Sequence, residues 1–249
     1  MAYLDTSREG VVPGDFLTAA VRAPTLEQKV EFLSRSSAYA QPATGVIRRE
    51  THMSWVFLTD DQVYKLKKPV RFPYLDFSNL RRREAACRAE LRLNRRLAPD
   101  VYLDVMPLRA TPRGLAIGED GPIMDWLVVM RRLDEAQTLE HAIVDRRVKP
   151  WQLDRLIATL VQFYRRAGRV FLSSAVHLRD WHQSLSDNLR MLLDPRLGLP
   201  AGLVRRVAGV QRSFFSQQRK TLAARVRYRS IVYGPGDLRP EHIWLGVPV

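Results

Sequence analysis

Apolar and polar positions alternate over short distances in the first half of the chain. Three apolar runs separated by polar turns predict strands of an antiparallel sheet at residues 46–50, 55–58 and 63–70. The segment 59–61 suits a turn, because its two aspartates tolerate turn geometry. A further hairpin is predicted at residues 101–110 and 114–117, and the nearly continuous apolar run 123–130 predicts a strand covered on both faces.

Two helices are predicted among these strands. Thr25, with Gln28 three residues later, has the spacing of a capping box, so the first helix should begin near Thr25. A longer helix is predicted from Ser78, which suits the N-cap position, to Ala98, where Pro99 follows. After residue 133 the periodicity becomes helical, and helices are expected at residues 153–164, 179–193 and 201–226.

The order of these elements predicts an α+β fold with two lobes. The first lobe, residues 23–130, would combine a small antiparallel sheet with one long helix. The second, residues 131–249, would be mainly helical. Residues 1–22 show little periodicity and are expected to form a flexible N-terminal arm. A seam between lobes is a common place for a ligand, so the connection near residues 130–134 is a candidate binding region.

The stretch from residue 231 to residue 249 has an unusual order of residue types. A β-branched pair leads into a Gly-Pro-Gly run, Asp237, a polar loop and a short apolar run. This order predicts a strand, a tight loop at residues 234–243 that presents one carboxylate, and a second strand, because glycine permits a tight backbone. Taken alone, Asp237 is as well explained as an ordinary turn residue.

Composition and charge limit the range of expected cellular compartments and binding partners. The only cysteine, Cys87, excludes a disulfide framework within one chain and fits a reducing cytoplasm. No apolar run is long enough to span a membrane, and the N-terminus does not have the pattern of a signal peptide. The net charge of +14 favours polyanionic partners, but 34 of the 40 cations are arginines, which a GC-rich genome also produces. Nucleic acid is therefore not the expected partner.

Lys65 and Glu90 are candidate site residues. Lys65 shares a strand face with Val63 and Lys67, and such a lysine is either a solvated edge residue or a phosphate-binding group. Glu90 has no cationic neighbour on its helix and lies on a stripe with Ala86, Leu93 and Leu97. An unpaired charge on a packed face is costly, so Glu90 needs a partner from another element, and Lys65 is the expected one.

Five segments together carry a resemblance to a known family. They include Val-Tyr-Lys-Leu-Lys-Lys-Pro-Val at residues 63–70 and Gly-Asp-Leu-Arg-Pro-Glu-His-Ile at residues 236–243, with residues 50–58, 90–102 and 126–133. The chain resembles the kinase-like phosphotransferases related to aminoglycoside and fructosamine kinases, especially a bacterial group often fused to a P-loop ATPase domain. The resemblance implies a bilobal protein-kinase-like fold and transfer of the γ-phosphoryl group of ATP to a small-molecule hydroxyl.

The resemblance also implies roles for particular residues. Lys65 would hold the α- and β-phosphates, Glu90 would anchor Lys65, and Asp237 would be the catalytic aspartate that orients the acceptor hydroxyl. The hinge whose backbone meets the adenine would be formed by Met130, Arg131, Arg132 and Leu133. The turn that covers the phosphates would contain Thr51, His52 and Ser54.

Two positions depart from the family pattern. Pro235 stands where a histidine commonly fixes the catalytic loop, and proline cannot replace its hydrogen bonds. His242 stands where most aminoglycoside kinases have a metal-binding asparagine, and Mg²⁺ prefers oxygen ligands, so His242 is a poor candidate metal ligand. The seven residues after His242 contain no carboxylate, so the Mg²⁺ site would be incomplete.

Three functions remain open. The first is an ATP-dependent phosphotransferase, which we expect to be impaired by loss of the C-terminal metal-binding segment. The second is a non-catalytic, truncated kinase-fold protein that binds nucleotide or a partner, such as a P-loop ATPase domain on another chain. The third is a polyanion binder that uses the arginine-rich surface. The acceptor stays unidentified, because the helical region that would shape its pocket contains no diagnostic residues.

Overall fold

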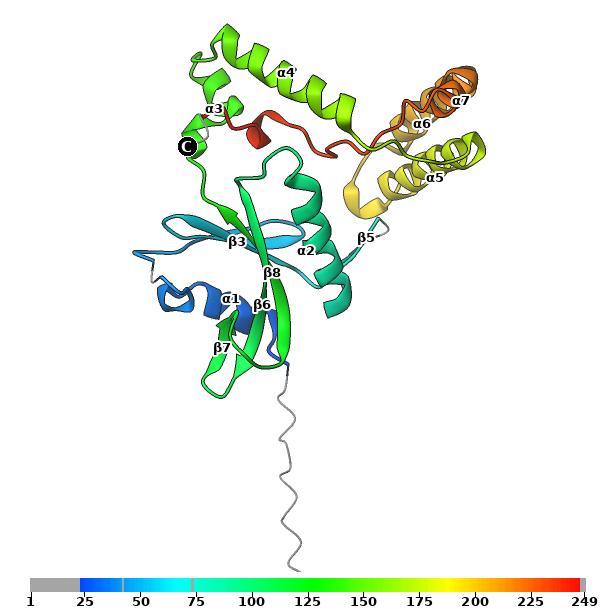
Figure 1. Cartoon of the computed structure of the whole chain (residues 1–249). Helices are drawn as coiled ribbons and strands as arrows, with labels where there is room; N and C mark the ends of the chain where they lie inside the picture. The colour runs from blue at the N-terminus through cyan, green and yellow to red at the C-terminus, as the bar shows by residue number, and fades with distance from the viewer. Residues whose placement is uncertain (1–22, 42, 73, 247–249) are drawn as a thin grey trace, which may run out of the picture. The chain divides into compact units, whose positions relative to one another are not determined.

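The structure, a computed structural model, describes residues 23–41, 43–72 and 74–246 (Figure 1). The chain divides into two compact units, Met1–Arg132 and Leu133–Val249. The expected N-terminal arm, residues 1–22, lies outside the described residues. The class is α+β, with an antiparallel sheet and its helices in the first unit and a mainly helical second unit.

Within the described residues, the first unit contains a curled six-stranded antiparallel sheet with the order β1-β2-β3-β8-β6-β7. Its strands are β1 (Ile47–Glu50), β2 (Ser54–Leu58), β3 (Gln62–Lys67), β6 (Tyr102–Thr111), β7 (Gly114–Ile117) and β8 (Ile123–Arg131). β8 pairs with β3 on one side and with β6 on the other. The predicted buried strand is thereby confirmed, and it joins the two predicted hairpins into one sheet.

The predicted strands and turn are confirmed with small shifts at their ends. Thr59 closes the turn between β2 and β3, where its N–H donates to the carbonyl of Gln62 at 2.9 Å. β3 ends at Lys67 instead of Val70, since Pro69 cannot donate to a ladder. A short hairpin that was not expected follows, formed by β4 (Arg71–Phe72) and β5 (Leu75–Asp76).

The two helices of this unit contribute to hydrophobic clusters on opposite faces of the sheet. α1 (Leu26–Leu33) packs Val30 and Leu33 into a cluster that includes Leu127 of β8. α2 (Leu80–Asn94) packs Cys87 into a second cluster that includes Val128 of the same strand. Because neighbouring side chains of a strand point to opposite faces, β8 supplies both clusters, and α2 lies along the sheet in Figure 1.

The helix starts are set by side-chain caps. The predicted capping box is confirmed, with Thr25 accepting from the N–H of Gln28 and the Gln28 side chain accepting from the N–H of Thr25. The N-cap of α2 is Asn79, not Ser78, because the Asn79 side chain accepts from the N–H of Arg82 at 2.9 Å. The Ser78 hydroxyl instead donates to Asp76. The helix also ends at Asn94, earlier than expected.

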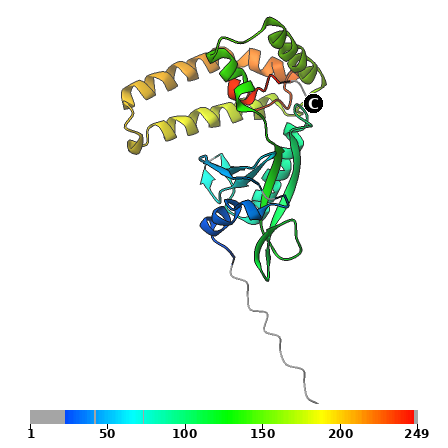
Figure 2. The same cartoon turned by 90° about the vertical axis from the view of Figure 1, so that its left-hand side faces the viewer.

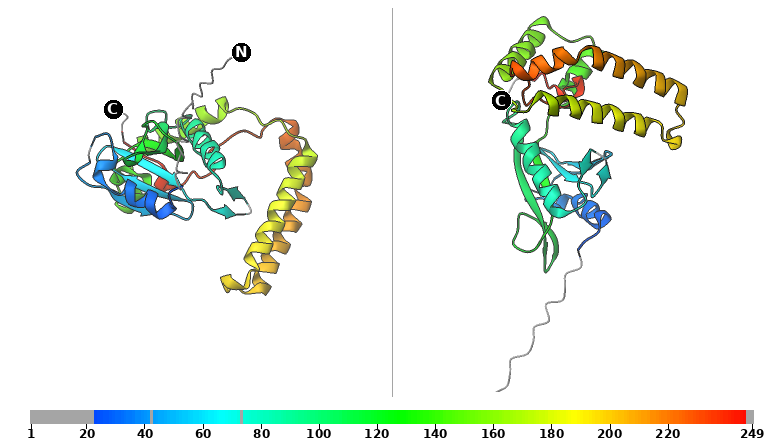
Figure 3. Two further views of the ribbon diagram at one scale, coloured as in Figure 1. Left: turned by 90° about the horizontal axis from the view of Figure 1, so that it is seen from below. Right: turned by 90° about the vertical axis from the view of Figure 1, so that its right-hand side faces the viewer.

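The described part of the second unit is mainly helical. Its α-helices are α3 (Leu139–Val144), α4 (Pro150–Arg166), α5 (Ser174–Leu192), α6 (Ala201–Gln217) and α7 (Arg219–Arg227). α5 contacts α6 and α7, and Figures 2 and 3 show α5 and α6 lying side by side. The helix expected at residues 201–226 is two helices, because the backbone at Gln218 leaves helical geometry. α5 begins earlier than expected, at a cap formed by Ser173.

The apolar residues at helical spacing in α4 do not form a buried face. Phe163 is the buried residue of this helix. The side chains whose spacing predicted the helix are between 40% and 58% exposed at Leu153, Ile157, Val161 and Tyr164. The periodicity therefore predicted the helix correctly but not the burial of its apolar side.

The expected strand, loop and strand around Asp237 are not formed as strands. Isolated bridges join Val232 to Arg169 and Trp244 to Thr138, and a short 3-10 helix (η4, Pro240–His242) lies between them. Pro235 and Pro240 lack the backbone donor that a ladder needs, which explains why the pairing does not extend. Among the described residues, no helix combines the length and the apolar character needed to cross a bilayer.

Candidate functional site

Lys65 and Glu90 are brought together by β3 and α2. Tyr64 and Leu66 of β3 belong to the cluster on the α1 side of the sheet, so Lys65 points to the α2 side. Its ammonium donates to Glu90 Oε1 at 2.9 Å. The contact expected from the sequence is therefore present.

Lys67 binds the same carboxylate, a contact that was not expected from the sequence. Its ammonium donates to Glu90 Oε2, so each oxygen of Glu90 has its own lysine. The Lys67 side chain is 7% exposed and its Nζ lies 5.0 Å from the centroid of the Phe77 ring, whereas the Lys65 side chain is 29% exposed. The spacing of two lysines on one strand face was the available signal. We call these three residues the Lys-Glu-Lys cluster.

The charges of the Lys-Glu-Lys cluster keep Glu90 ionised. Burial alone raises the pKa of the Glu90 carboxyl, but the positive charges of Lys65 and Lys67 together outweigh burial and hold this pKa below its ordinary value. Nearby on β6, burial and, to a smaller extent, the Glu90 charge raise the pKa of Tyr102 to about 12. The cluster thus combines two ammonium groups with one carboxylate.

The face of α2 that carries Glu90 differs from the expected stripe. Arg83 and Cys87 are the buried residues of the helix, and Leu91 packs beside them against the sheet. Leu93, which the stripe placed inside, is 46% exposed. The expected stripe was wrong because Arg83 occupies a buried position on the side of α2 that packs against the sheet. A pattern of apolar residues alone does not identify a side that contains an arginine.

A second charged cluster, also unexpected, connects the two faces of the sheet. Asp125 of β8 accepts from Lys29 of α1 at 2.7 Å and from Arg83 of α2 at 2.8 Å. All three side chains are less than 10% exposed. We call these residues the Asp125 bridge. Because the Asp125 bridge is enclosed, it offers little access to a ligand and joins elements of the fold instead.

α2 is held near both ends. Arg83 joins its first turns to Asp125 and also donates to the carbonyl of Phe77 at 3.0 Å. At the other end, Arg95 donates to the carbonyl of Tyr102 at 2.7 Å and to that of Leu103. Glu90 lies between these two attachments, so its position is set by the sheet.

The turn at Thr51, His52 and Ser54 connects β1 to β2. The N–H of Thr51 donates to the carbonyl of Ser54 at 2.8 Å, and the N–H of Ser54 donates to Thr51 Oγ1 at 3.0 Å. Ser54 is buried and stands opposite Lys67 in the β2–β3 register. The turn is therefore next to the Lys-Glu-Lys cluster, but the hydrogen bonds of Thr51 and Ser54 are made to each other. His52 is exposed.

The predicted hinge residues end β8. Met130 is paired with Val63 and with Tyr102 in the sheet. The N–H of Arg131 donates to the carbonyl of Val101 and the N–H of Arg132 donates to that of Asp61, both at 2.8 Å. These two donors are used within the sheet, so an adenine bound here would need other backbone groups of the segment, such as those of Leu133.

Asp237 belongs to the second unit and is 64% exposed. Arg239 Nε pairs with Asp237 Oδ1 at 2.9 Å, and Arg239 also pairs with Glu241 at 3.1 Å. His242 Nδ1 lies 2.8 Å from the backbone carbonyl of Asp237, where it acts as the donor. His242 therefore braces the loop from within, through the backbone of Asp237.

This loop does not fit Mg²⁺. The nitrogen of His242 that faces Asp237 is engaged with a carbonyl, and the Asp237 carboxylate is paired with an arginine. Mg²⁺ prefers several oxygen ligands. In the described part of the chain, no group of three or more His, Cys, Asp or Glu side chains could hold a metal ion.

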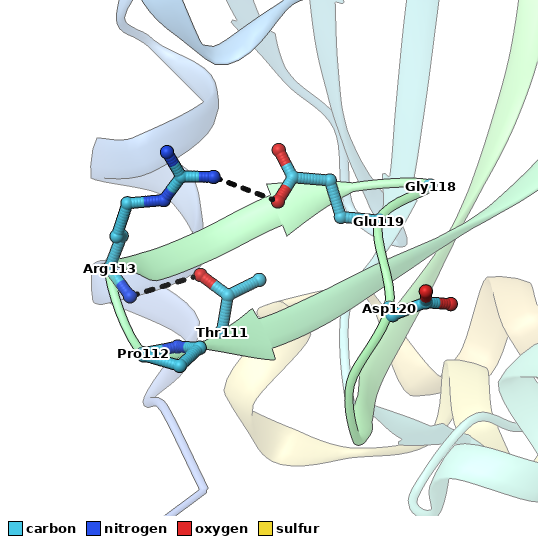
Figure 4. Close-up of a pocket in the computed structure, with 6 residues that line it drawn as sticks. All are labelled: Thr111, Pro112, Arg113, Gly118, Glu119 and Asp120. Carbon is cyan, nitrogen blue, oxygen red and sulfur yellow. Dashed lines mark hydrogen bonds and ion pairs between the residues drawn. The ribbon is translucent and has the colours of Figure 1, made fainter.

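A hollow of about 540 Å³ lies where the β6–β7 hairpin meets the β7–β8 turn (Figure 4). It contains none of the predicted site residues. Its lining includes the ion pair between Arg113 and Glu119 at 3.7 Å, and their side chains are 88% and 54% exposed. Such an exposed pair contributes little energy, so the Lys-Glu-Lys cluster remains the better candidate.

Together these observations define an α+β protein in which a strand lysine and a helix carboxylate meet on one face of a curled antiparallel sheet, followed by a mainly helical unit. The chain is 33% identical over 202 residues to the uncharacterized proteins Rv2004c of Mycobacterium tuberculosis and Mb2027c of Mycobacterium bovis. The match covers 79% of this chain and 38% of each relative, so the chain spans well under half of their length. No family model matches the chain, and no solved structure matches it.

Proposed function

We propose that the chain is part of a kinase-like phosphotransferase, in which the first unit binds ATP and the γ-phosphoryl group passes to a small-molecule hydroxyl. The observation that supports this function is the 2.9 Å ion pair between Lys65 and Glu90. In protein kinases a strand lysine contacts the nucleotide phosphates and is paired with a helix glutamate. The same two residue types come from the same kinds of element here.

The local chemistry suits a phosphate. Lys65 is partly exposed, so its ammonium can meet a ligand while Glu90 fixes its direction. The positive excess of the Lys-Glu-Lys cluster favours an anionic group, and an ammonium is a suitable donor to phosphate oxygens. Glu90 needs no rearrangement for this role, because it is already ionised and paired.

Asp237 is the proposed group that orients the acceptor hydroxyl. Its Oδ1 atom is paired with Arg239 and its Oδ2 atom lies 3.5 Å from His242 Nδ1, so an acceptor must compete with the guanidinium or approach Oδ2 beside the imidazole. The high exposure of Asp237 leaves it accessible to such an acceptor. No Mg²⁺ is assigned to this loop, because its described residues lack a suitable set of oxygen ligands.

The nucleotide-binding part is tested by calorimetry with ATP on the wild-type chain and on Lys65→Met. Loss of the ammonium should weaken ATP binding by about tenfold or more, since a contact to a charged phosphate contributes about 1.5 kcal/mol or more. Arg113→Met, which removes an exposed cation from the β6–β7 hairpin, should bind ATP like the wild type. Equal affinities for all three proteins would refute the phosphate role of Lys65.

A non-catalytic nucleotide-binding protein is the second candidate. It is favoured by the pairing of Asp237 with Arg239 and by the poor fit of the loop to Mg²⁺. Steady ATP turnover that is abolished by Asp237→Ala would reject this candidate. ATP binding without turnover, unchanged by Asp237→Ala, would instead favour the non-catalytic candidate for this chain.

A further inference from the structure

We propose that Lys67 is a positioning residue of the phosphate site, which neutralises Glu90 and so leaves Lys65 available for the polyphosphate of ATP. This inference rests on the proposed function, because it assigns a role within the same site. It differs from a one-lysine arrangement, in which the carboxylate and the ligand compete for a single ammonium.

The exposure of the two lysines separates their roles. Lys67 is 7% exposed, binds Glu90 Oε2 and lies beside the Phe77 ring, so little of its ammonium can meet a ligand. Lys65 is 29% exposed and binds the other oxygen, Oε1. The enclosed lysine is thus suited to hold the carboxylate, and the exposed lysine is suited to meet the phosphates.

The charge of the cluster gives the physical reason. An ammonium has three donor hydrogens, and Lys65 directs one of its hydrogen bonds to Glu90. With Lys67 in place, the cluster has one more positive than negative charge. Without Lys67, the Lys65 and Glu90 charges would cancel, and an incoming polyphosphate would meet an ion pair in a partly buried region, where charges are weakly screened.

The Asp125 bridge provides an internal comparison. It also has two cations on one carboxylate, but Lys29, Arg83 and Asp125 are all enclosed. Such a cluster can only contribute to the fold. The Lys-Glu-Lys cluster likewise has two cations and one carboxylate but leaves one lysine partly exposed, which a purely structural cluster does not require.

The test compares Lys67→Met with Lys29→Met, since each removes one enclosed lysine from a carboxylate that keeps a second cation. ATP, ADP and AMP are titrated into each folded variant by calorimetry. Lys67→Met should weaken ATP binding by about tenfold, with a smaller loss for ADP and the smallest for AMP, because the lost charge acts on the phosphates. Lys29→Met should lower stability but keep all three affinities.

The outcomes separate the two proposals. If the wild type binds none of the three nucleotides, the proposed function fails. If the wild type binds ATP and Lys67→Met binds it equally well, or loses all three affinities alike, the role of Lys67 fails. Lys67→Arg, which keeps the charge, should retain most of the ATP affinity. If Lys67→Met does not fold, Lys67→Gln replaces it and must show the same order of losses.

Discussion

Glu90 is bound by two ammonium groups, and its removal should be costly for the fold. Glu90→Gln leaves the ammonium groups of Lys65 and Lys67 close together without the negative charge that compensates them. Breaking a largely buried ion pair from one side destabilises a protein by about 3 kcal/mol. Urea unfolding of the variant should show a loss of this size.

Glu84→Gln is the matched control on the same helix. Glu84 pairs with Arg88 at 2.9 Å in an exposed i,i+4 pair, which contributes about 0.5 kcal/mol or less. Similar losses in both variants would show that Glu90 is no more important than a surface carboxylate.

The contribution of Glu90 should also depend on pH. Its pKa is lower in the folded chain than in the unfolded chain, where a glutamate titrates near about 4.3. The stabilisation by the ionised group is therefore fully present above that value and is lost as the pH falls through the folded pKa. The difference in unfolding free energy between wild type and Glu90→Gln should shrink below about pH 4, and a constant difference would contradict this account.

The site could be predicted only in part from single residues. Lys65 and Glu90 were found because an isolated carboxylate on a packed helix needs a distant partner. Lys67 was missed because Lys65 alone already provides the cation that a buried Glu90 needs. The Asp125 bridge was missed for a different reason, since its members lie on three separate elements, and Lys29 and Arg83 stand among other charged residues in the sequence.

Elements with their own local signal were predicted well. The capping box at Thr25 and the buried strand β8 depend on nearby residues, and both are present. Pairing around Asp237 depends on distant strands, and Pro235 and Pro240 limit it to isolated bridges. The buried side of α2 was wrong because the charge of Arg83 is neutralised by tertiary contacts that a periodicity cannot reveal.

The Asp125 bridge ties three elements together, so its loss should affect the whole first unit. Asp125→Ala would leave Lys29 and Arg83 enclosed without their carboxylate. We expect a destabilisation of about 3 to 5 kcal/mol, measured by urea unfolding. Asp120→Ala, in the exposed turn before β8, should change stability by less than about 0.5 kcal/mol. A destabilisation by Asp125→Ala as small as that by Asp120→Ala would show that the Asp125 bridge does not hold the first unit together.

The two units differ in how well they enclose apolar side chains. Both hydrophobic clusters identified in the described residues lie in the first unit. The second unit leaves many large apolar side chains exposed, including Trp151, Ile157, Val210 and Phe214. The first unit should therefore depend less on other parts of the protein, or on a partner, for its stability.

This difference predicts the behaviour of the isolated units. A fragment of residues 23–132 should unfold cooperatively on heating and remain monomeric, as followed by circular dichroism and sedimentation. A fragment of residues 133–246 should self-associate, because exposed apolar surface favours association. A first fragment without a cooperative transition would show that its core needs the second unit.

The charge of the whole molecule is also uneven. Residues 195–236 contain nine arginines and lysines and no aspartate or glutamate. Nonspecific attraction of polyanions to this segment should fall with salt, whereas a contact between Lys65 and a phosphate in a partly buried site should be screened less. If the chain binds nucleotide as proposed, affinities measured at moderate salt would therefore report mainly on the Lys-Glu-Lys cluster.

The attachments of α2 determine what happens when a ligand arrives. Arg83 and Arg95 fasten the helix to the sheet on both sides of Glu90, and neither attachment involves a ligand. The carboxylate is consequently in place beforehand, and no swing of the helix is needed to assemble the pair with Lys65. Little ordering entropy is then lost on association, so binding of an anionic ligand should need no slow conformational step.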